Sequence, residues 1–208
     1  MTSAAPALSL RLTQAGYGAG APVLGALDLS VAPGETLGIM GPSGVGKTTL
    51  MRILAGLHRR FAGSRHVAGR LAMVFQDPML LPWRRSDQNL TLTTGCSEPE
   101  ARAALADVGL AGLEARYPGA LSLGQQRRLA LARAFAGRPA VLLLDEPFVS
   151  LDAATHAEML ELFRRLRAEA GVATVLVTHS EAEAGALCDR VLWLDGRPAR
   201  LTARAQAA

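Results

Sequence analysis

A short glycine-rich stretch carries the clearest chemistry in this chain. Residues 41–49 read Gly-Pro-Ser-Gly-Val-Gly-Lys-Thr-Thr and fit the pattern G-x-x-x-x-G-K-[ST]. In such a loop, backbone N–H groups wrap phosphate oxygens, the lysine reaches the β- and γ-phosphates, and a Ser or Thr hydroxyl holds Mg²⁺. The pattern therefore predicts a nucleoside triphosphate site. Its residues are Gly41, Pro42, Ser43, Gly44, Val45, Gly46, Lys47, Thr48 and Thr49, with Thr48 as the Mg²⁺ ligand.

The composition of the chain supports this interpretation of Lys47. Lys47 is the only lysine, and every other residue among the 22 Lys and Arg is an arginine. Arginine carries a planar fork and lysine a compact point charge, so the two are not interchangeable at a phosphate. The single exception to the arginine bias thus falls where a lysine is chemically required.

A pair of acids ends an apolar run at residues 141–147, which read Val-Leu-Leu-Leu-Asp-Glu-Pro. Asp145 is placed to hold Mg²⁺ through its water shell, because Mg²⁺ usually keeps several waters in proteins. Glu146 is placed to orient or deprotonate the water that attacks a phosphate. The alternative is an exposed acidic pair at a strand end, which a neighbouring phosphate loop disfavours.

Two polar residues follow other predicted strands. Gln76 comes after residues 71–75, and its amide oxygen can bind Mg²⁺ or hold the attacking water. His179 comes after residues 173–177, and a ring nitrogen there can contact the γ-phosphate. Taken alone, either residue is more often structural, so both count only as members of the set.

Two further features have open alternatives. Ser122 precedes a predicted helix, where its hydroxyl and the first backbone N–H groups can form an anion site or only cap the helix. Tyr17 lies in a glycine-rich turn, where its ring can stack on adenine or pack on its own sheet.

The order of predicted elements places these residues. A buried strand at 35–40 leads into the phosphate loop and a helix at 47–55, which is the context the loop motif needs. The order predicts an α/β fold, a phosphate-loop NTPase core with a mostly parallel sheet flanked by helices and an antiparallel β edge. The other predicted strands are 8–12, 23–31, 71–75, 140–144, 172–177, 191–194 and 198–201, and the other predicted helices are 98–110, 124–136 and 153–169.

The bulk composition narrows the class of protein. Half of the 208 residues are hydrophobic and 19% are charged, which suits one domain with a buried core. We find no apolar run of ~18–20 residues, which a membrane span needs, and no secretory signal before Arg11. Cys96 and Cys188 show no metal or redox spacing and indicate reduced thiols. The net charge of +4 is dispersed, so we expect no nucleic-acid partner.

The whole set resembles the ATP-binding subunit of an ABC transporter, over about residues 8–201. The resemblance implies one ABC ATPase domain at 1–208, with a helical signature subdomain at about 76–138, and ATP and Mg²⁺ as cofactors. The matches are residues 41–49 to the phosphate loop, Gln76 to the glutamine loop, 121–125 to the family signature, 141–147 to the second nucleotide motif, 150–152 to the loop at the dimer interface, His179 to the switch histidine and Tyr17 to the adenine-stacking aromatic.

The resemblance also implies a mechanism and partners. Two copies pair head to tail, and each ATP lies between the phosphate loop of one copy and Ser122, Gly124 and Gln125 of the other, with Asp152 at the interface. The catalytic set is then Glu146, His179, Gln76 and Lys47, and the metal set Thr48, Gln76 and Asp145. Closing and reopening of this dimer drives a separate transmembrane permease from the cytoplasmic face of the inner or plasma membrane, where the chain is peripheral.

Two departures from the family pattern stand out. Leu123 occupies a signature position that is usually glycine, which predicts that ATP binds but the dimer closes slowly. The segment between Gly56 and Leu71 is shorter than in relatives, which predicts that part of the antiparallel edge is trimmed.

The segment after Gln76 favours one transport direction. Residues 77–83 read Asp-Pro-Met-Leu-Leu-Pro-Trp and resemble the nitrate/sulfonate/taurine importer group, which implies uptake of a small anionic solute and an external solute-binding protein. A small haem-exporter-like subunit is the first alternative, because the chain is short and residues 125–128 resemble that group. A soluble ABC ATPase acting on DNA or ribosomes is the second, although the chain lacks a second cassette and heptad arms. A third alternative is a cassette with weak ATPase activity that acts as a regulated clamp, and only Leu123 supports it.

Overall fold

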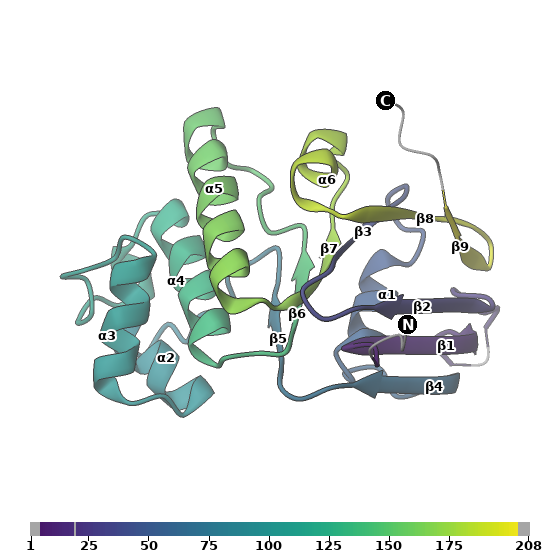
Figure 1. Cartoon of the computed structure of the whole chain (residues 1–208), viewed down its shortest axis with the longest axis horizontal. Coiled ribbons are helices and arrows are strands. Elements are labelled where there is room, and N and C mark those ends of the chain that lie inside the picture. The colour runs from purple at the N-terminus through teal and green to yellow at the C-terminus, as the bar shows by residue number, and fades with distance from the viewer. Residues whose placement is uncertain (1–4, 19, 204–208) are drawn as a thin grey trace.

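The computed structural model describes residues 5–18 and 20–203, which form two β-sheets and the helices packed around them (Figure 1). The strands are β1 Leu8–Ala15, β2 Leu27–Val31, β3 Thr36–Met40, β4 Phe61–Val67, β5 Leu71–Val74, β6 Val141–Asp145, β7 Ala173–Val177, β8 Arg190–Gly196 and β9 Ala199–Ala203. The helices are α1 Lys47–Leu54, α2 Ser86–Thr94, α3 Glu98–Asp107, α4 Leu123–Ala136, α5 Ala153–Ala170 and α6 Glu181–Leu187, with a 3₁₀ turn at Pro118–Ala120.

The main sheet has six strands in the order β5-β6-β7-β3-β8-β9. All neighbours in it are parallel except β8 and β9, which form an antiparallel hairpin. A second sheet, in the order β2-β1-β4, is antiparallel throughout. The predicted α/β class with a mostly parallel sheet and an antiparallel edge is confirmed.

The strands β3, β6 and β7 of the main sheet are buried along their whole length, which explains their continuous apolar runs. In β6, Val141 and Leu143 belong to one core cluster with α1, β1 and β2. Leu142 and Leu144 point to the other face and pack in a second cluster with α3, α4 and α5. Because side chains alternate along a strand, one apolar run serves two cores.

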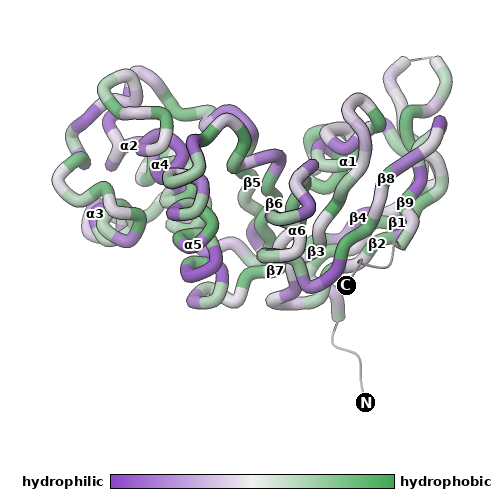
Figure 2. Tube along the Cα trace, turned by 90° about the horizontal axis from the view of Figure 1, so that it is seen from above, coloured by the Kyte–Doolittle hydropathy of each residue, from purple (hydrophilic) through white to green (hydrophobic). Residues whose placement is uncertain are grey.

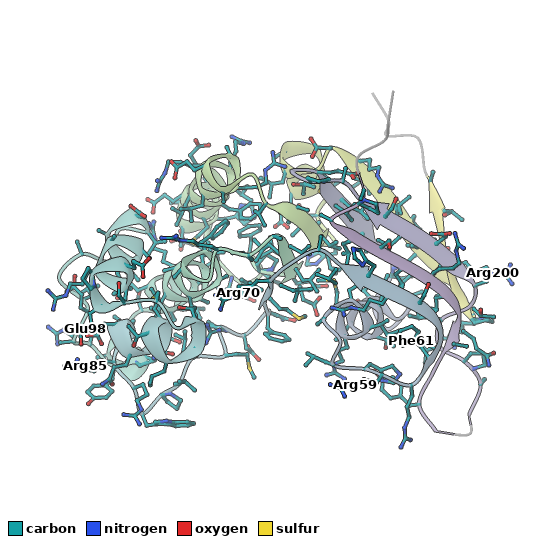
Figure 3. The ribbon with its side chains drawn as sticks, turned by 60° about the horizontal axis from the view of Figure 1, so that its bottom comes forward. Arg59, Phe61, Arg70, Arg85, Glu98 and Arg200 are labelled. Atoms are coloured by element: carbon teal, nitrogen blue, oxygen red, sulfur yellow. The ribbon has the colours of Figure 1, made fainter. Side chains whose placement is uncertain are left out.

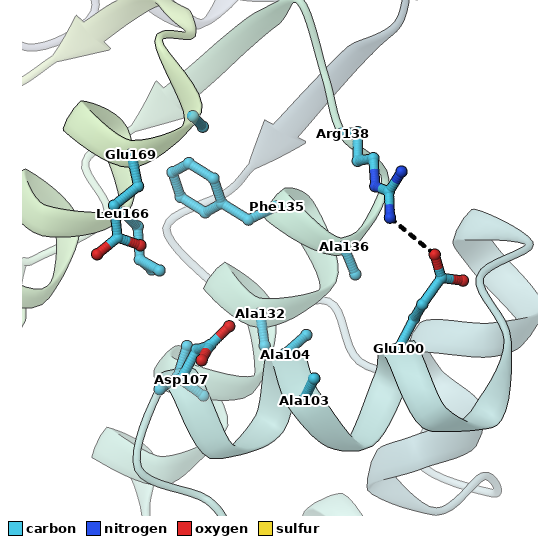
Figure 4. A pocket seen from close by; sticks show the side chains of 12 residues that line it. Glu100, Ala103, Ala104, Asp107, Ala132, Phe135, Ala136, Arg138, Leu166 and Glu169 are labelled. Atoms are coloured by element: carbon cyan, nitrogen blue, oxygen red, sulfur yellow. Dashed lines mark hydrogen bonds and ion pairs between the residues drawn. The ribbon is translucent and has the colours of Figure 1, made fainter.

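Helices α2, α3 and α4 lie together at one end of the molecule, away from β1, β2 and β4 (Figure 1). Their apolar residues, such as Leu90, Leu105 and Leu129, are fully buried in the second cluster. The C-terminal halves of α4 and α5 and the adjacent face of α3 enclose a hollow of about 320 Å³ lined by alanines and Phe135, at whose edge Arg138 pairs with Glu100 (Figure 4).

Three elements of the structure, β4, α2 and α6, were not predicted from the sequence. The segment between Gly56 and Leu71 forms the strand β4, which begins at Phe61 and pairs along β1 (Figure 3). That this edge is trimmed relative to other family members stays a prediction. The residues of β4, Phe-Ala-Gly-Ser-Arg-His-Val, show no regular alternation of apolar and polar side chains, so the pairing with β1 defines the strand. The two backbones approach closely, since a Cβ added at Gly63 would lie 2.0 Å from the Arg11 carbonyl oxygen. Helix α2 was not predicted, because its polar and β-branched residues carry no helical apolar stripe.

The predictions about membrane spans, cysteines and the distribution of charge can be compared with the structure. Over the described part of the chain, each helix is too short or too polar to cross a membrane. Cys96 and Cys188 are free thiols, and burial raises the pKa of Cys188 to about 12. Arginines such as Arg59, Arg85 and Arg200 lie far apart on the surface, in agreement with dispersed positive charge (Figure 3).

Candidate functional site

The candidate site lies at the edge of the main sheet where the parallel strands end. The phosphate loop follows β3, Gln76 follows β5, Asp145 ends β6 and His179 follows β7. Because these strands are parallel neighbours, their carboxyl ends meet at one edge, which is where open α/β sheets bind ligands. The topology thus gathers residues that are up to 138 positions apart, from Gly41 to His179.

The phosphate loop depends on glycine at two positions. Gly41 has φ 151° and Gly46 has φ 120°, a backbone region that side chains rarely adopt. A Cβ on Gly41 would lie 2.2 Å from the Leu194 carbonyl oxygen, and one on Gly46 would lie 2.8 Å from Leu24 Cδ2. The loop therefore turns tightly against β8 and places the N-terminus of α1, with its unpaired N–H groups, at the sheet edge.

Lys47 lies inside this loop and is only 8% exposed. Its Nζ donates to the carbonyl oxygens of Gly41, at 2.8 Å, and Pro42, at 3.0 Å. A buried ammonium is costly unless it is hydrogen-bonded, and these two bonds use two of its three donors. The arrangement holds a positive charge where the backbone N–H groups converge, which is an environment for phosphate.

Asp145 is buried at the end of β6, beside Thr48 of the loop. Burial is the main cause that raises the pKa of its carboxyl, and the adjacent charge of Glu146 raises it further. The hydrogen bond with Thr48 and the charge of Lys47 act in the opposite direction and favour the ionised form. The carboxyl groups of Asp145 and Glu146 and the hydroxyl of Thr48 therefore place several oxygen atoms next to the phosphate loop.

Glu146 and His179 face each other across the ends of β6 and β7. His179 Nδ1 lies 3.6 Å from Glu146 Oε2. Glu146 has φ 49°, an uncommon region for a residue other than glycine, and its N–H donates to the Val177 carbonyl oxygen at 3.0 Å. The backbone is thus held in an unfavourable conformation that turns this carboxylate toward the histidine, a kind of strain that collects at functional sites.

Tyr17 is half exposed next to the start of α1. Its hydroxyl lies 3.3 Å from Thr49 Oγ1, and this hydrogen bond is the main cause that lowers its pKa. Its ring meets His58 edge to face, with the ring centroids 4.8 Å apart. The tyrosine therefore stands beside the phosphate loop and is not packed into the sheet, which favours the stacking interpretation.

The predicted signature residues lie elsewhere. Ser122 caps α4: its Oγ accepts from the Gln125 N–H at 3.2 Å, and Gln125 Oε1 accepts from the Ser122 N–H at 3.0 Å. Gly124 approaches α5, since an added Cβ would lie 3.2 Å from Thr155. In the same turn of α5, the Asp152 carboxylate accepts from the Thr155 N–H at 3.0 Å.

The signature and the phosphate loop do not meet within one chain. Seen from above, α4 lies on one side of the main sheet and α1 on the other (Figure 2). The structure brings Lys47, Asp145, Glu146 and His179 to one edge, with Gln76 exposed at the end of the neighbouring strand. Ser122, Leu123, Gly124, Gln125 and Asp152 instead form a separate group at the starts of α4 and α5.

Sequence reasoning missed several buried or half-buried polar residues near the ends of β6 and β7. Arg127 of α4 reaches the Pro147 carbonyl oxygen at 3.4 Å, and its Nε has no hydrogen-bond partner within the described residues. Burial is the main cause that lowers its pKa. His156, Thr178 and Glu183 form a second group, joined by hydrogen bonds. No local spacing marks these residues, because the contacts join different elements.

The described residues contain no cluster of three or more His, Cys, Asp or Glu side chains arranged for a metal ion. Asp145, Thr48 and Gln76 supply oxygen atoms of the kind that Mg²⁺ prefers.

Comparisons with known proteins agree with this geometry. The family model described as "ABC transporter" matches residues 24–149. The chain is 49% identical to an aliphatic sulfonates import ATP-binding protein, SsuB 2, of Rhizobium johnstonii, over 83% of this chain and 71% of that protein. It is 48% identical to SsuB 1 of Rhodococcus jostii, over 83% of this chain and 73% of that protein.

A solved structure extends the comparison to three dimensions. The dimeric ATP-binding cassette MJ0796, in a post-hydrolysis state bound to ADP and Pi, matches with a TM-score of 0.79 and 26% identity. The match covers 93% of this chain and 96% of that one. The chain therefore belongs to the ABC transporter family, as a nucleotide-binding ATPase subunit.

Proposed function

We propose that this ATPase powers the import of a small organic anion of the sulfonate class through a separate transmembrane permease. The sulfonate class and the import direction are supported by the similarity to the SsuB proteins. The observation that carries the ATP-driven mechanism is the placement of two half-sites on one chain. Lys47, Asp145, Glu146 and His179 lie at the carboxyl edge of the main sheet. Ser122 caps α4, which lies on the other side of this sheet from α1 (Figure 2). A second copy in head-to-tail contact would complete each half, so ATP would be required to close the dimer.

The reaction is a displacement at the γ-phosphorus of ATP. The loop N–H groups and Lys47 bind the β- and γ-phosphates and offset their charge. Glu146 accepts a proton as the water oxygen forms a bond to phosphorus, and the bond to the β-phosphate oxygen breaks to give ADP and phosphate. His179 holds the Glu146 carboxylate and contacts the γ-phosphate, while Gln76 helps to position the water.

The residues present fit Mg²⁺ as a cofactor. Thr48 and Asp145 would hold the ion, directly or through water, and the Gln76 amide would complete the protein ligands. The ion supplies neutralisation of phosphate charge.

The other half-site would be formed by the N-terminus of α4. Its N–H groups and the Ser122 hydroxyl would bind the γ-phosphate held by the partner, with Gly124, Gln125 and Asp152 at the interface. Residues 76–138 would then move as a helical signature subdomain of the single domain at 1–208. Leu123 is 47% exposed on this surface, so its side chain would lie between Ser122 and the opposing nucleotide.

Replacing Leu123 by glycine should speed ATP turnover. The smaller residue would let the two half-sites approach more closely, and we expect kcat to rise several-fold with little change in the affinity for ATP. The measurement is steady-state phosphate release at saturating ATP. The matched control is Leu57→Gly, because Leu57 is an exposed leucine outside the signature. An unchanged kcat in Leu123→Gly would contradict the proposed obstruction.

The segment after Gln76 offers a surface for the permease. Met79 and Trp83 are 62% and 68% exposed. Arg133 fixes the segment by donating to the carbonyl oxygens of Pro78 at 2.9 Å and Met79 at 2.7 Å, and Asn89 bonds both backbone groups of Leu81. A rigid exposed aromatic residue is typical of the centre of a protein interface.

Replacing Trp83 by alanine should weaken the contact with the permease and leave the ATP site intact. We expect co-purification of the multi-span partner from detergent-solubilised membranes to fall at least severalfold, while nucleotide affinity of the isolated chain stays unchanged. Leu57→Ala serves as the control for loss of an exposed apolar side chain. Full recovery of the partner with Trp83→Ala would exclude this residue from the interface.

Two measurements test the proposed function itself. The proteins that co-purify with the tagged chain should include a multi-span permease, which would place the chain at the cytoplasmic face of the membrane, and, for an importer, an external solute-binding protein. Cells carrying the chain should take up a labelled alkanesulfonate, and cells carrying the Lys47→Ala form should not. Recovery of ribosomal proteins or nucleic acid without a permease would favour the soluble class. A permease without uptake of the sulfonate would favour export or another solute.

A further inference from the structure

We propose that Glu183 is a positioning residue for ATP hydrolysis, which acts with Thr178 and His156 to hold His179 against Glu146. The proposal rests on the roles proposed above for Glu146 and His179. It concerns residues outside the motif positions named above. It is carried by a closed ring that starts and ends at the Glu183 carboxylate and consists of side-chain contacts and two short backbone stretches, 178–179 and 146–148.

The first side of the ring runs from Glu183 to His179. Glu183 lies in the first turn of α6 and is 7% exposed. Its Oε2 accepts from the Thr178 hydroxyl at 2.5 Å, and Thr178 Oγ1 in turn accepts from the Ser180 N–H at 3.0 Å. These bonds fix the backbone on both sides of His179.

The second side runs from Glu183 to Glu146. His156 Nε2 donates to Glu183 Oε1 at 2.8 Å. The His156 ring and the buried Phe148 ring form a T-shaped pair, with the centroids 6.1 Å apart and the planes at 82°. Phe148 is two residues after Glu146, and Glu146 Oε2 is 3.6 Å from His179 Nδ1, which closes the ring.

His156 also connects the ring to the proposed dimer interface. The His156 N–H donates to the Asp152 carbonyl oxygen at 2.9 Å in the first turn of α5. A movement of Asp152 on dimer closure would therefore reach Glu183 through a single turn of helix.

The exposure of the side chains explains why such support is needed. The His179 side chain is 63% exposed, so its own packing restrains it little. The Glu183 carboxylate is buried and costly to leave without partners, so its two hydrogen bonds strongly define its place. The ring therefore transfers the rigidity of a buried carboxylate to an exposed histidine, and a small misplacement of a reacting group slows catalysis steeply.

The test uses threonine variants in the full-length chain. Thr178→Val keeps the shape of the side chain and removes its hydroxyl, whereas Thr178→Ser keeps the hydroxyl. We expect Thr178→Val to lower kcat roughly 10- to 100-fold with little change in KM for ATP. Thr178→Ser should stay within about twofold of the original chain, since the donor is retained. Thr174→Val is the control, because Thr174 is also a fully buried threonine, in β7, and lies outside the ring.

A double-mutant cycle with His179→Ala separates positioning from a structural role. If Thr178 acts through His179, Thr178→Val should slow the His179→Ala chain by less than about twofold, because coupled residues are not additive. An equal slowing in both backgrounds, or unchanged kcat in Thr178→Val alone, would overturn the proposal. Glu183→Gln replaces Thr178→Val in the cycle if the valine form does not fold.

The His179→Ala chain alone distinguishes the two levels of the argument. It should cripple turnover and leave nucleotide affinity largely intact. If His179→Ala is slow but Thr178→Val is not, only the positioning role of Glu183 fails. If His179→Ala turns over normally, the role of His179 fails, and the inference that depends on it fails as well.

Discussion

Replacing Glu146 by glutamine should trap ATP in a stable dimer and lower kcat by about 100-fold or more, as expected for loss of a general base. The amide keeps the shape of the side chain and its contact with His179 but cannot take a proton from water. ATP binding should persist, because Lys47 and the loop N–H groups do not involve this side chain. Phosphate release measures the rate, and size-exclusion chromatography with ATP measures the dimer.

A matched control and the contrary outcomes define this test. Glu161→Gln also neutralises a carboxylate, but Glu161 is an exposed residue on α5 whose pairing with Arg164 contributes little. It should leave both rate and dimer unchanged. A normal rate in Glu146→Gln would show that Glu146 is not the base. Loss of rate without an ATP-bound dimer would contradict the idea that hydrolysis is what reopens the dimer.

Replacing Lys47 by alanine should abolish hydrolysis and weaken ATP binding roughly 10- to 100-fold, the range for losing a hydrogen bond to a charged group. The change removes the buried ammonium and also leaves the carbonyl oxygens of Gly41 and Pro42 without this donor. Binding of a fluorescent ATP analogue and phosphate release give the two values. Normal turnover would contradict the role of the loop.

Lys47→Arg provides the sharper companion experiment. It keeps the positive charge, and it brings the site into line with every other basic position in the chain. The planar guanidinium is larger than the ammonium and has a different donor geometry, so we expect it not to fit the slot between the two carbonyl oxygens. Loss of turnover in both variants would show that the shape of the lysine matters as well as its charge.

Local patterns predicted the core of this molecule well. The strand, loop and helix at 35–55 became β3, the phosphate loop and α1, and the run at 140–144 became β6, which lies between β5 and β7 in the main sheet. These elements are written in consecutive residues: a buried parallel strand needs an apolar run, and a phosphate loop needs glycines at fixed spacing.

The elements that were missed depend on distant partners. β4 exists because its backbone pairs with β1, some 50 residues earlier in the chain, and its sequence includes Gly63 only because Arg11 approaches so closely. The helix α2 buries Leu90 and Asn89 against other elements, while its own residues carry no regular apolar stripe. Pairing and burial of this kind cannot be read from a short window.

The sequence by itself determined which chemistry is present, because residue type and short spacing define a phosphate loop, an acidic strand end and a capped helix. Only the tertiary structure decided how these parts meet. It set Glu146 beside His179, 33 positions away. It also placed α4, which Ser122 caps, on the other side of the main sheet from α1, which begins at Lys47 (Figure 2). It also revealed the ring through Glu183 and His156, because hydrogen bonds between separate elements arise from packing and leave no pattern along the chain.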